Sequence, residues 1–546
     1  MALPGIGAVS KTSFTLCPPR NLCPRHRSSF AAHEAIAKSD FLAGNGHQDQ
    51  ATSPPSTSPS NGVEGIRSLW KKMSSNELGI KNKMISKQTR SVLSELRRRG
   101  YDVYLVGGCV RDLIMRRVPK DFDIITTANL SEVKKAFSRC DIVGKRFPIC
   151  HVHINDYIVE VSSFSTSRKY SSNYVRYISR RPPDCDEHDC VRWRNCLGRD
   201  FTINGLMFDP YTRLVYDYLG GMEDIKKAKV RTVIPAQTSF QEDCARILRA
   251  IRIAARLGFR FNRETAQCIK DLATSVIRLD KGRILMEMNY MLAYGSAEAS
   301  MRLLWKFGLL ELLLPIQAAY FVSQGFRRRD EGTNMLLALL SNLDSLLAPD
   351  RPCQDSLCFC NRVAILAFHE ALACVPRDPL VVATFSLAVH NGGDMLEAVN
   401  ISRRITSEHN QNYSEILEPR MWDEDKGLIN EVLDLASSVI TALECMTDEY
   451  FVSQKMAQYP QAPMSNLVFI PLQLYLRVCR IFECVKSRDS EGGFVPKQGS
   501  KINYQSLAHG GLAELRHVFA RVVFDTVYPP NIEEQDMRSS SCTGSS

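Results

Sequence analysis

The sequence predicts an α+β protein in which a mixed α/β domain, over residues 85–225, is followed by helices only. A segment with helical apolar spacing (86–99) precedes a short apolar run (104–106) that ends at two glycines, which is the pattern of a helix, a strand and a tight turn. Residues 152–161 alternate with a period of two around an Asn-Asp turn, as in a β-hairpin. From about residue 241, apolar residues recur at the spacing of a helix face instead.

The length of the chain, 546 residues, exceeds what one hydrophobic core usually supports, so we expect several domains. The expected segments are a leader with a Ser/Pro-rich linker (1–64), the α/β head (85–225), a helical neck (226–315), a helical body and tail (316–530) and a polar, disordered tail (531–546).

The leader has an unusual charge pattern, because residues 1–33 contain no Asp or Glu and carry basic residues among several Ser and Thr. The basic side chains are Lys11, Arg20, Arg25 and Arg27. This composition is typical of an organellar transit peptide and predicts a chloroplast or mitochondrial destination. A disordered leader without a targeting role is the alternative.

The formal net charge of +10 favours polyanionic partners such as nucleic acid over acidic ones. The eighteen cysteines follow no regular framework, which favours reduced thiols. No apolar run approaches the ~20 residues that span a bilayer, so we expect no membrane partner. The oligomeric state is left open.

The densest chemical signal is the sequence LVGGCVRD (105–112), which is followed nine residues later by DFD (121–123). Gly107 and Gly108 would let backbone N–H groups approach phosphate oxygens, and Arg111 could neutralise them, as in a cradle for a triphosphate. Asp121 and Asp123 stand at i and i+2 of a strand, so both point to one face and could bind Mg²⁺. Each signal alone is usually a turn or a solvated surface pair; together, in this order, they become specific.

Four motifs in order resemble those of the class II RNA nucleotidyltransferase family, which contains CCA-adding enzymes and bacterial-type poly(A) polymerases. The motifs are GGCVRD with DFD, RDFTINGLMFD (199–209), YDYLGGMEDI (216–225) and EDCARILRAIR (242–252). The resemblance covers roughly residues 92–315. It implies a head domain of the polymerase-beta nucleotidyltransferase kind, followed by an all-α neck, body and tail.

By this resemblance, Asp121 and Asp123 hold two Mg²⁺ ions for attack of an RNA 3′ hydroxyl on the α-phosphate of ATP, with pyrophosphate as the leaving group. A third carboxylate would suit the site, and we rank Asp200 slightly above Glu160. The alternatives are an edge-strand residue facing water for Glu160, and a helix N-cap or a partner of Arg199 for Asp200.

Nucleotide selection is expected on one helix, where four charged residues fall at every third position. These are Asp243, Arg246, Arg249 and Arg252. A carboxylate acceptor beside a guanidinium donor matches the edge of adenine, and of cytosine, but not of uracil or guanine. Asp243 and Arg246 would therefore select the base, while Arg249 and Arg252 resemble supporting base and triphosphate contacts. The alternative is a basic amphipathic helix with surface ion pairs.

The stretch DIVGKRFPICHV (141–152) is similar to a pattern of bacterial-type poly(A) polymerases, and within it Lys145 and Arg146 are candidate RNA contacts. It favours polyadenylation of RNA 3′ ends; CCA addition to tRNA and a non-catalytic RNA-binding protein on the same fold are the alternatives. Two positions depart from the family pattern: Gly198 stands where a second arginine often precedes Arg199, and Cys109 where a smaller residue is common. Arg199 itself is retained, so we expect it to contact a phosphate of the nucleotide.

An insert between residues 165 and 198 interleaves basic and aromatic residues, a composition that suits single-stranded RNA or a mobile surface loop. Tyr174 and Tyr177 are its candidate stacking residues. It also contains four potential zinc ligands, although their spacing is not a common one. These are Cys185, His188, Cys190 and Cys196.

Overall fold

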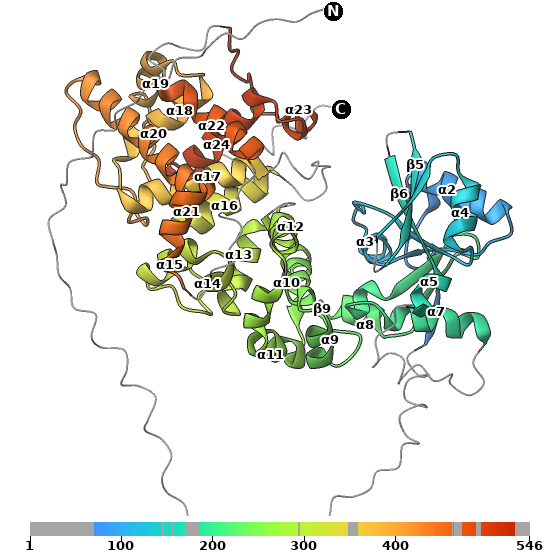
Figure 1. Ribbon diagram of the computed structural model, residues 1–546. Helices are drawn as coiled ribbons and strands as arrows, with labels where there is room; N and C mark the ends of the chain where they lie inside the picture. The colour runs from blue at the N-terminus through green and yellow to red at the C-terminus, as the bar shows by residue number, and fades with distance from the viewer. Residues whose placement is uncertain are drawn as a thin grey trace, which may run out of the picture. The chain divides into compact units, whose positions relative to one another are not determined.

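The computed structural model describes residues 70–144, 147–155, 157–169, 186–292, 295–347, 359–460, 462, 472–486 and 493–529 (Figure 1). Its first part is built on an eight-stranded sheet with the order β1-β8-β7-β2-β3-β6-β5-β4. The strands are β1 (Lys71–Ser74), β2 (Val103–Val106), β3 (Asp123–Thr126), β4 (Cys140–Val143), β5 (Ile149–Ile154), β6 (Tyr157–Ser163), β7 (Leu206–Asp209) and β8 (Leu214–Asp217). Only β3 and β6 pair in parallel in this sheet.

Both faces of the sheet are covered by helices, because the central strands carry apolar residues on both sides. Leu105 and Ile124 face a cluster that contains α2 (Lys87–Arg98), α3 (Gly108–Ile114) and α4 (Leu130–Ala136). Tyr104 and Val106 face a second cluster with α5 (Phe164–Lys169) and α7 (Glu187–Leu197). The alternation along β2 follows from the period of two of a strand. The predicted α+β class and the helix–strand–turn order of residues 86–108 are confirmed.

The rest of the described chain is mainly helical, starting with α8 (Gly221–Lys226), α9 (Ala236–Glu242), α10 (Ala245–Leu257), α11 (Arg263–Asp271), α12 (Lys281–Leu292), α13 (Ala297–Lys306), α14 (Leu310–Leu313) and α15 (Pro315–Ser323). It continues with α16 (Met335–Leu346), α17 (Phe359–Cys374), α18 (Pro379–His390), α19 (Met395–Ser402), α20 (Asp425–Thr447), α21 (Glu449–Met456), α22 (Leu472–Lys486), α23 (Tyr504–Ala508) and α24 (Leu512–Val527). Short 3₁₀ turns, η1 (Asn82–Met84), η2 (Thr202–Asn204) and η3 (Ala273–Arg278), join some elements.

The expectation of a purely helical neck is wrong in one detail. Two short strands, β9 (Lys229–Val230) and β10 (Arg260–Phe261), pair in parallel on either side of α9 and α10. Gly258 ends α10 in the left-handed conformation, with φ of 70°, and this turns the chain back towards β9.

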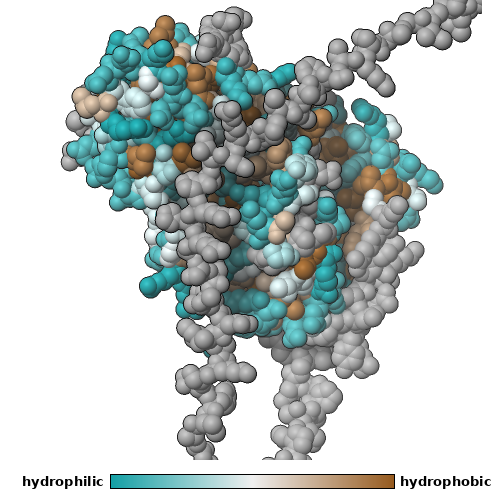
Figure 2. Space-filling model, turned by 60° about the vertical axis from the view of Figure 1, so that its left-hand side comes forward, coloured by the Kyte–Doolittle hydropathy of each residue, from teal (hydrophilic) through white to brown (hydrophobic). Residues whose placement is uncertain are grey.

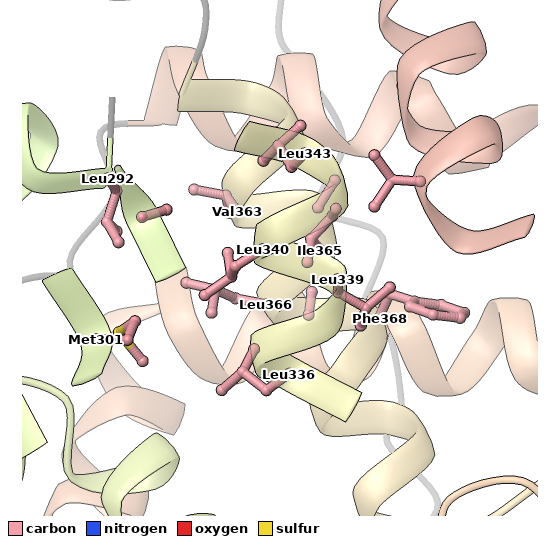
Figure 3. Packing of buried hydrophobic residues seen from close by; sticks show 14 of the residues in the cluster. Leu292, Met301, Leu336, Leu339, Leu340, Leu343, Val363, Ile365, Leu366 and Phe368 are labelled. Carbon is pink, nitrogen blue, oxygen red and sulfur yellow. The ribbon is translucent and has the colours of Figure 1, made fainter. Parts of the chain in front are cut away.

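One hydrophobic core continues across residue 315, where we expected the neck to give way to the body. Figure 3 shows Leu292 of α12 and Met301 of α13 beside leucines of α16, with the apolar face of α17 behind them. The labelled α16 and α17 residues are Leu336, Leu339, Leu340, Leu343, Val363, Ile365, Leu366 and Phe368. Neck and body helices thus bury their apolar faces against each other.

Most of the face in Figure 2 is hydrophilic, with apolar residues in scattered patches. Within the described ranges, no helix combines the length and the hydropathy that a membrane span requires.

Candidate active site

Strand order brings the glycine turn and the two aspartates of the DFD motif to the same edge of the sheet. Asp123 opens β3, where it pairs with Val106 of β2 on one side and with Glu160 of β6 on the other. Since Val106 ends β2, Gly107 follows directly beside Asp123. Four consecutive buried residues in β2 fix this strand between its neighbours, so the position of the turn is set by the core.

Gly107 provides space that no other residue would leave. Its φ of 80° and ψ of −143° lie in a region that essentially only glycine adopts. A Cβ atom there would stand 3.3 Å from Oδ2 of Asp123 and 3.4 Å from Nη1 of Arg199. The missing side chain therefore lets a carboxylate and a guanidinium approach the turn together.

At this edge of the sheet, the surroundings of Asp123 disfavour its ionised form, and a bound cation would favour it. Burial raises the pKa of Asp123 to about 6; Arg199 opposes this shift, whereas the charges of Asp121 and Glu160 add to it. Asp121 and Glu160 are exposed. Among the residues that the structure describes, no salt bridge reaches Asp121 or Asp123, while Glu160 lies 3.7 Å from Nε2 of His151.

The two aspartates fit a magnesium ion better than a metal held by protein ligands alone. In the described part of the chain, no three His, Cys, Asp or Glu side chains come together as a metal cluster. Mg²⁺ is usually bound by one or two carboxylates and completed by water and substrate phosphates. Asp121 and Asp123 have the chemistry for that mode, and burial disfavours the ionised form of Asp123 when no cation is present.

Asp200 has a different environment from the one we expected when we ranked it above Glu160 as the third metal carboxylate. It is buried; Oδ1 accepts hydrogen bonds from the Phe201 N–H at 2.8 Å and from Nδ2 of Asn204 at 3.1 Å. Oδ2 lies 3.0 Å from Nη2 of Arg249. Burial alone would raise the pKa of Asp200, but Arg249, Asn204 and the Phe201 N–H hold it below its usual value. Both oxygens are thus engaged within the chain.

The Arg111 guanidinium, expected at the triphosphate, is turned into the protein. Its Nε and Nη2 donate to Oδ1 of Asp112 at 2.9 and 2.7 Å, and its Nη1 donates to Oδ1 of Asn204 at 2.6 Å. The turn of α3 places Arg111 under Gly108, where a Cβ would stand 3.4 Å from Nη2. Sequence reasoning missed Asp112 and Asn204, although both lie inside the quoted motifs.

Arg199, the other arginine expected to contact a phosphate, lies beside the carboxylates. It follows Gly198, which ends α7, and its guanidinium stands next to Gly107 and Asp123. Its side chain forms no salt bridge with any described residue and is half-buried. It can therefore reach a phosphate close to the metal carboxylates.

The single helix predicted through residues 243–252 is interrupted at its start. α9 ends at Glu242, Asp243 is extended, and α10 begins at Ala245, whose N–H donates to Oδ1 of Asp243 at 3.1 Å. This contact two residues along the chain is an Asx turn just before the N-cap, Cys244. Nη1 of Arg246 donates to Oγ of Ser239 at 2.8 Å. Asp243 and Arg246 remain half-buried neighbours.

The other two arginines of the series are engaged within the chain. Arg249 pairs with Asp200, and Nε of Arg252 donates to Oε2 of Glu287, a buried residue of α12, at 3.0 Å. The Arg252 guanidinium also lies 5.3 Å from the centre of the Tyr290 ring. The supporting base and triphosphate contacts expected for Arg249 and Arg252 stay a prediction.

The remaining candidates are only partly described. Lys145, Arg146, Tyr174, Tyr177 and Cys185 lie outside the described residues. Of the other proposed zinc ligands, Cys190 is disulfide-bonded and Cys196 is a buried free thiol. The reduced state expected for the thiols holds for eleven cysteines of the described chain, and Cys190 departs from it.

Two family models match the chain. The model described as the poly A polymerase head domain matches residues 103–231, which contain the glycine turn, both aspartates and Arg199. The model described as the probable RNA and SrmB-binding site of polymerase A matches residues 258–321, from the end of α10 into α15.

Curated relatives cover the same region. Poly(A) polymerase I of Escherichia coli is 32% identical over 334 residues, which are 57% of this chain and 70% of the relative. A CCA-adding enzyme of Staphylococcus aureus is 31% identical over 219 residues, 40% of this chain and 53% of the relative. Among solved structures, the Bacillus stearothermophilus CCA-adding enzyme in complex with CTP aligns with 22% identity and a TM-score of 0.39, over 73% of this chain and 92% of that one.

Proposed function

Since this chain belongs to the family of RNA nucleotidyltransferases that contains the bacterial poly(A) polymerases and the CCA-adding enzymes, we propose that it adds adenylates from ATP to RNA 3′ ends. The observation that carries the proposal is the pair Asp121 and Asp123, which stands without a described salt-bridge partner beside the glycine turn. The poly(A) polymerase relative matches a larger share of both chains than the CCA-adding one, which supports adenylation.

The reaction joins the RNA 3′ oxygen to the α-phosphate of ATP and breaks the bond to the pyrophosphate. Mg²⁺ bound at Asp121 and Asp123 would promote loss of the hydroxyl proton and offset the charge that develops on the phosphates. Arg199 is placed to bind the triphosphate next to these carboxylates. Gly107 keeps the turn open, so that a phosphate oxygen can approach where a side chain would otherwise stand.

Base selection fits the pair at the start of α10. The Asp243 carboxylate can accept a hydrogen bond from the exocyclic amino group of adenine, while Arg246 donates to the adjacent ring nitrogen. The Ser239 hydroxyl already holds one end of the Arg246 guanidinium and so limits its rotation. Cytosine offers the same order of donor and acceptor, which keeps CCA addition as the second candidate.

The deciding experiment supplies the full-length protein with Mg²⁺, a generic RNA and a tRNA that ends before CCA, in ATP alone or in ATP with CTP. A ladder of adenylates on both RNAs, lost in Asp121→Ala/Asp123→Ala, is expected. The control is Asp102→Ala, which removes a carboxylate of the same domain that pairs with Arg97 instead. Three additions confined to the tRNA and dependent on CTP would establish CCA addition; RNA binding without incorporation would establish a non-catalytic protein.

The charge pattern of residues 1–33 supports import into a chloroplast or mitochondrion as part of the proposal. A fluorescent protein fused after residue 65 is expected to enter one of these organelles. Diffuse cytosolic fluorescence would contradict the assignment.

A further inference from the structure

The helix that carries Arg246 is fastened to the head by one ion pair. Arg249 lies three residues after Arg246 on α10, and its Nη2 reaches Oδ2 of Asp200 at 3.0 Å. Three residues further along α10, Arg252 pairs with Glu287 of α12 at 3.0 Å. Two of its own arginines thus tie the helix to the head and to the neck, and Nη1 of Arg117 in the head also donates to the Arg256 carbonyl at 3.1 Å.

From Asp200, buried side-chain hydrogen bonds continue to the glycine turn. Asn204 donates to Asp200 at 3.1 Å and accepts from Arg111 at 2.6 Å, and Arg111 pairs with Asp112. Arg111 belongs to α3, the helix that starts directly after Gly107. A continuous path of paired side chains thus links α10 to the turn beside the metal carboxylates. Its last link is the ion pair between Arg249 and Oδ2 of Asp200, an oxygen that has no hydrogen bond within the described chain. Buried polar groups joined in this way limit the movement of the elements that carry them.

We propose that Asp200 and Arg249 form a positioning pair that sets the base-selecting residues in register with the metal carboxylates. The inference rests on the proposed function. A shift of α10 at Arg249 also moves Arg246, because residues at i and i+3 of a helix share one face. Asp200 directly follows Arg199, so the same contact holds the proposed triphosphate ligand next to Gly107. The pair acts through these neighbours, and neither member needs to touch the nucleotide.

A second ion pair, between Asp224 of α8 and Arg231 directly after β9, provides a matched control. Arg231 lies 2.8 Å from Asp224, and the exposed fractions of its two side chains, 37% and 9%, nearly equal the 38% and 8% of Arg249 and Asp200. Asp224 also accepts a hydrogen bond from Thr202 at 2.6 Å. Its pairing partner comes from the segment after α8 and not from α10. A purely structural ion pair should behave the same at either place.

The test compares Arg249→Met, Arg249→Lys and Arg231→Met in the full-length protein, with melting temperatures measured for each. The readout is the ratio of kcat/KM for ATP over UTP in RNA extension. We expect Arg249→Met to lower this ratio by about 2- to 30-fold, the range typical of residues that couple sites, and Arg249→Lys to restore part of it. Arg231→Met should change the melting temperature and leave the ratio unaltered. Asp200→Asn should reproduce the effect of Arg249→Met.

Three outcomes would overturn the positioning pair. An equal rise of KM for ATP and UTP in Arg249→Met would make Arg249 a phosphate contact. Equal effects of Arg249→Met and Arg231→Met on the ratio would mean that both ion pairs only stabilise the fold. An unchanged ratio in Arg249→Met would mean that Arg249 has no role in base selection. If the unaltered protein extends no RNA, the proposed function fails instead. Equilibrium binding of ATP and UTP then replaces kcat/KM, and a preference for ATP that Arg249→Met does not weaken rejects the pair.

Discussion

Replacement of Asp123 by asparagine is expected to stabilise the metal-free protein and to abolish nucleotide transfer. The pKa of Asp123 is raised from 3.8 to about 6, chiefly by burial. The folded state therefore binds the proton more tightly than the unfolded state, and ionisation of Asp123 opposes folding. The cost is absent below pH 4, grows between pH 4 and 6 and is complete above pH 6. Two pKa units correspond to about 2–3 kcal/mol, which the neutral amide avoids.

The assay is thermal unfolding in EDTA at several pH values between 4 and 8. The melting temperature of Asp123→Asn should exceed that of the unaltered protein increasingly as the pH rises through 6. Addition of Mg²⁺ should raise the melting temperature of the unaltered protein and have much less effect on the variant, because the ion restores the favourable environment of the carboxylate. Asp121→Asn, at an exposed position, is the comparison and should stabilise less. Parallel pH profiles for Asp123→Asn and the unaltered protein would refute the reasoning.

Three further predictions follow from the same contacts. Gly107→Ala forces a Cβ into a glycine-only conformation beside the Asp123 carboxylate. It should lower the free energy of unfolding by about 1–3 kcal/mol in chemical denaturation and sharply reduce RNA extension. Full activity would contradict the close packing of the turn. Arg111→Met leaves the buried Asp112 carboxylate without its ion-pair partner. It should lower the free energy of unfolding by about 3–5 kcal/mol in urea titrations. Replacement of a surface arginine should not cause a loss of this size. Tyr218→Phe removes the hydroxyl that donates to Asp189 at 2.6 Å and should destabilise the protein by about 1–3 kcal/mol; an unchanged melting temperature would mean that this buried hydrogen bond contributes nothing.

Local sequence signals located most of the elements that build the site. The apolar run before Gly107 is β2, the DFD motif leads into β3, and Ser86 caps α2 with a hydrogen bond from the Thr89 N–H at 3.1 Å. Each of these features depends on residues a few positions apart, so their spacing is visible in the chain itself. The break before α10 was missed, because Asp243 fits the three-residue spacing of the arginines as well as it fits an Asx turn.

The sequence by itself determined the fold class, the glycine turn and the pair of aspartates. The expected placement of both aspartates on one strand is wrong, because β3 begins at Asp123 and Asp121 precedes it. Only the tertiary structure decided which charged groups are available to substrates. Arg111 is engaged by Asn204, 93 residues away, and Asp200 by Arg249, whereas Arg199 is left beside Asp123. Charges of the same type look alike in a sequence. Their partners are chosen by the packing of distant segments, because a buried charge is stable only where an opposite charge or a hydrogen-bonding group meets it.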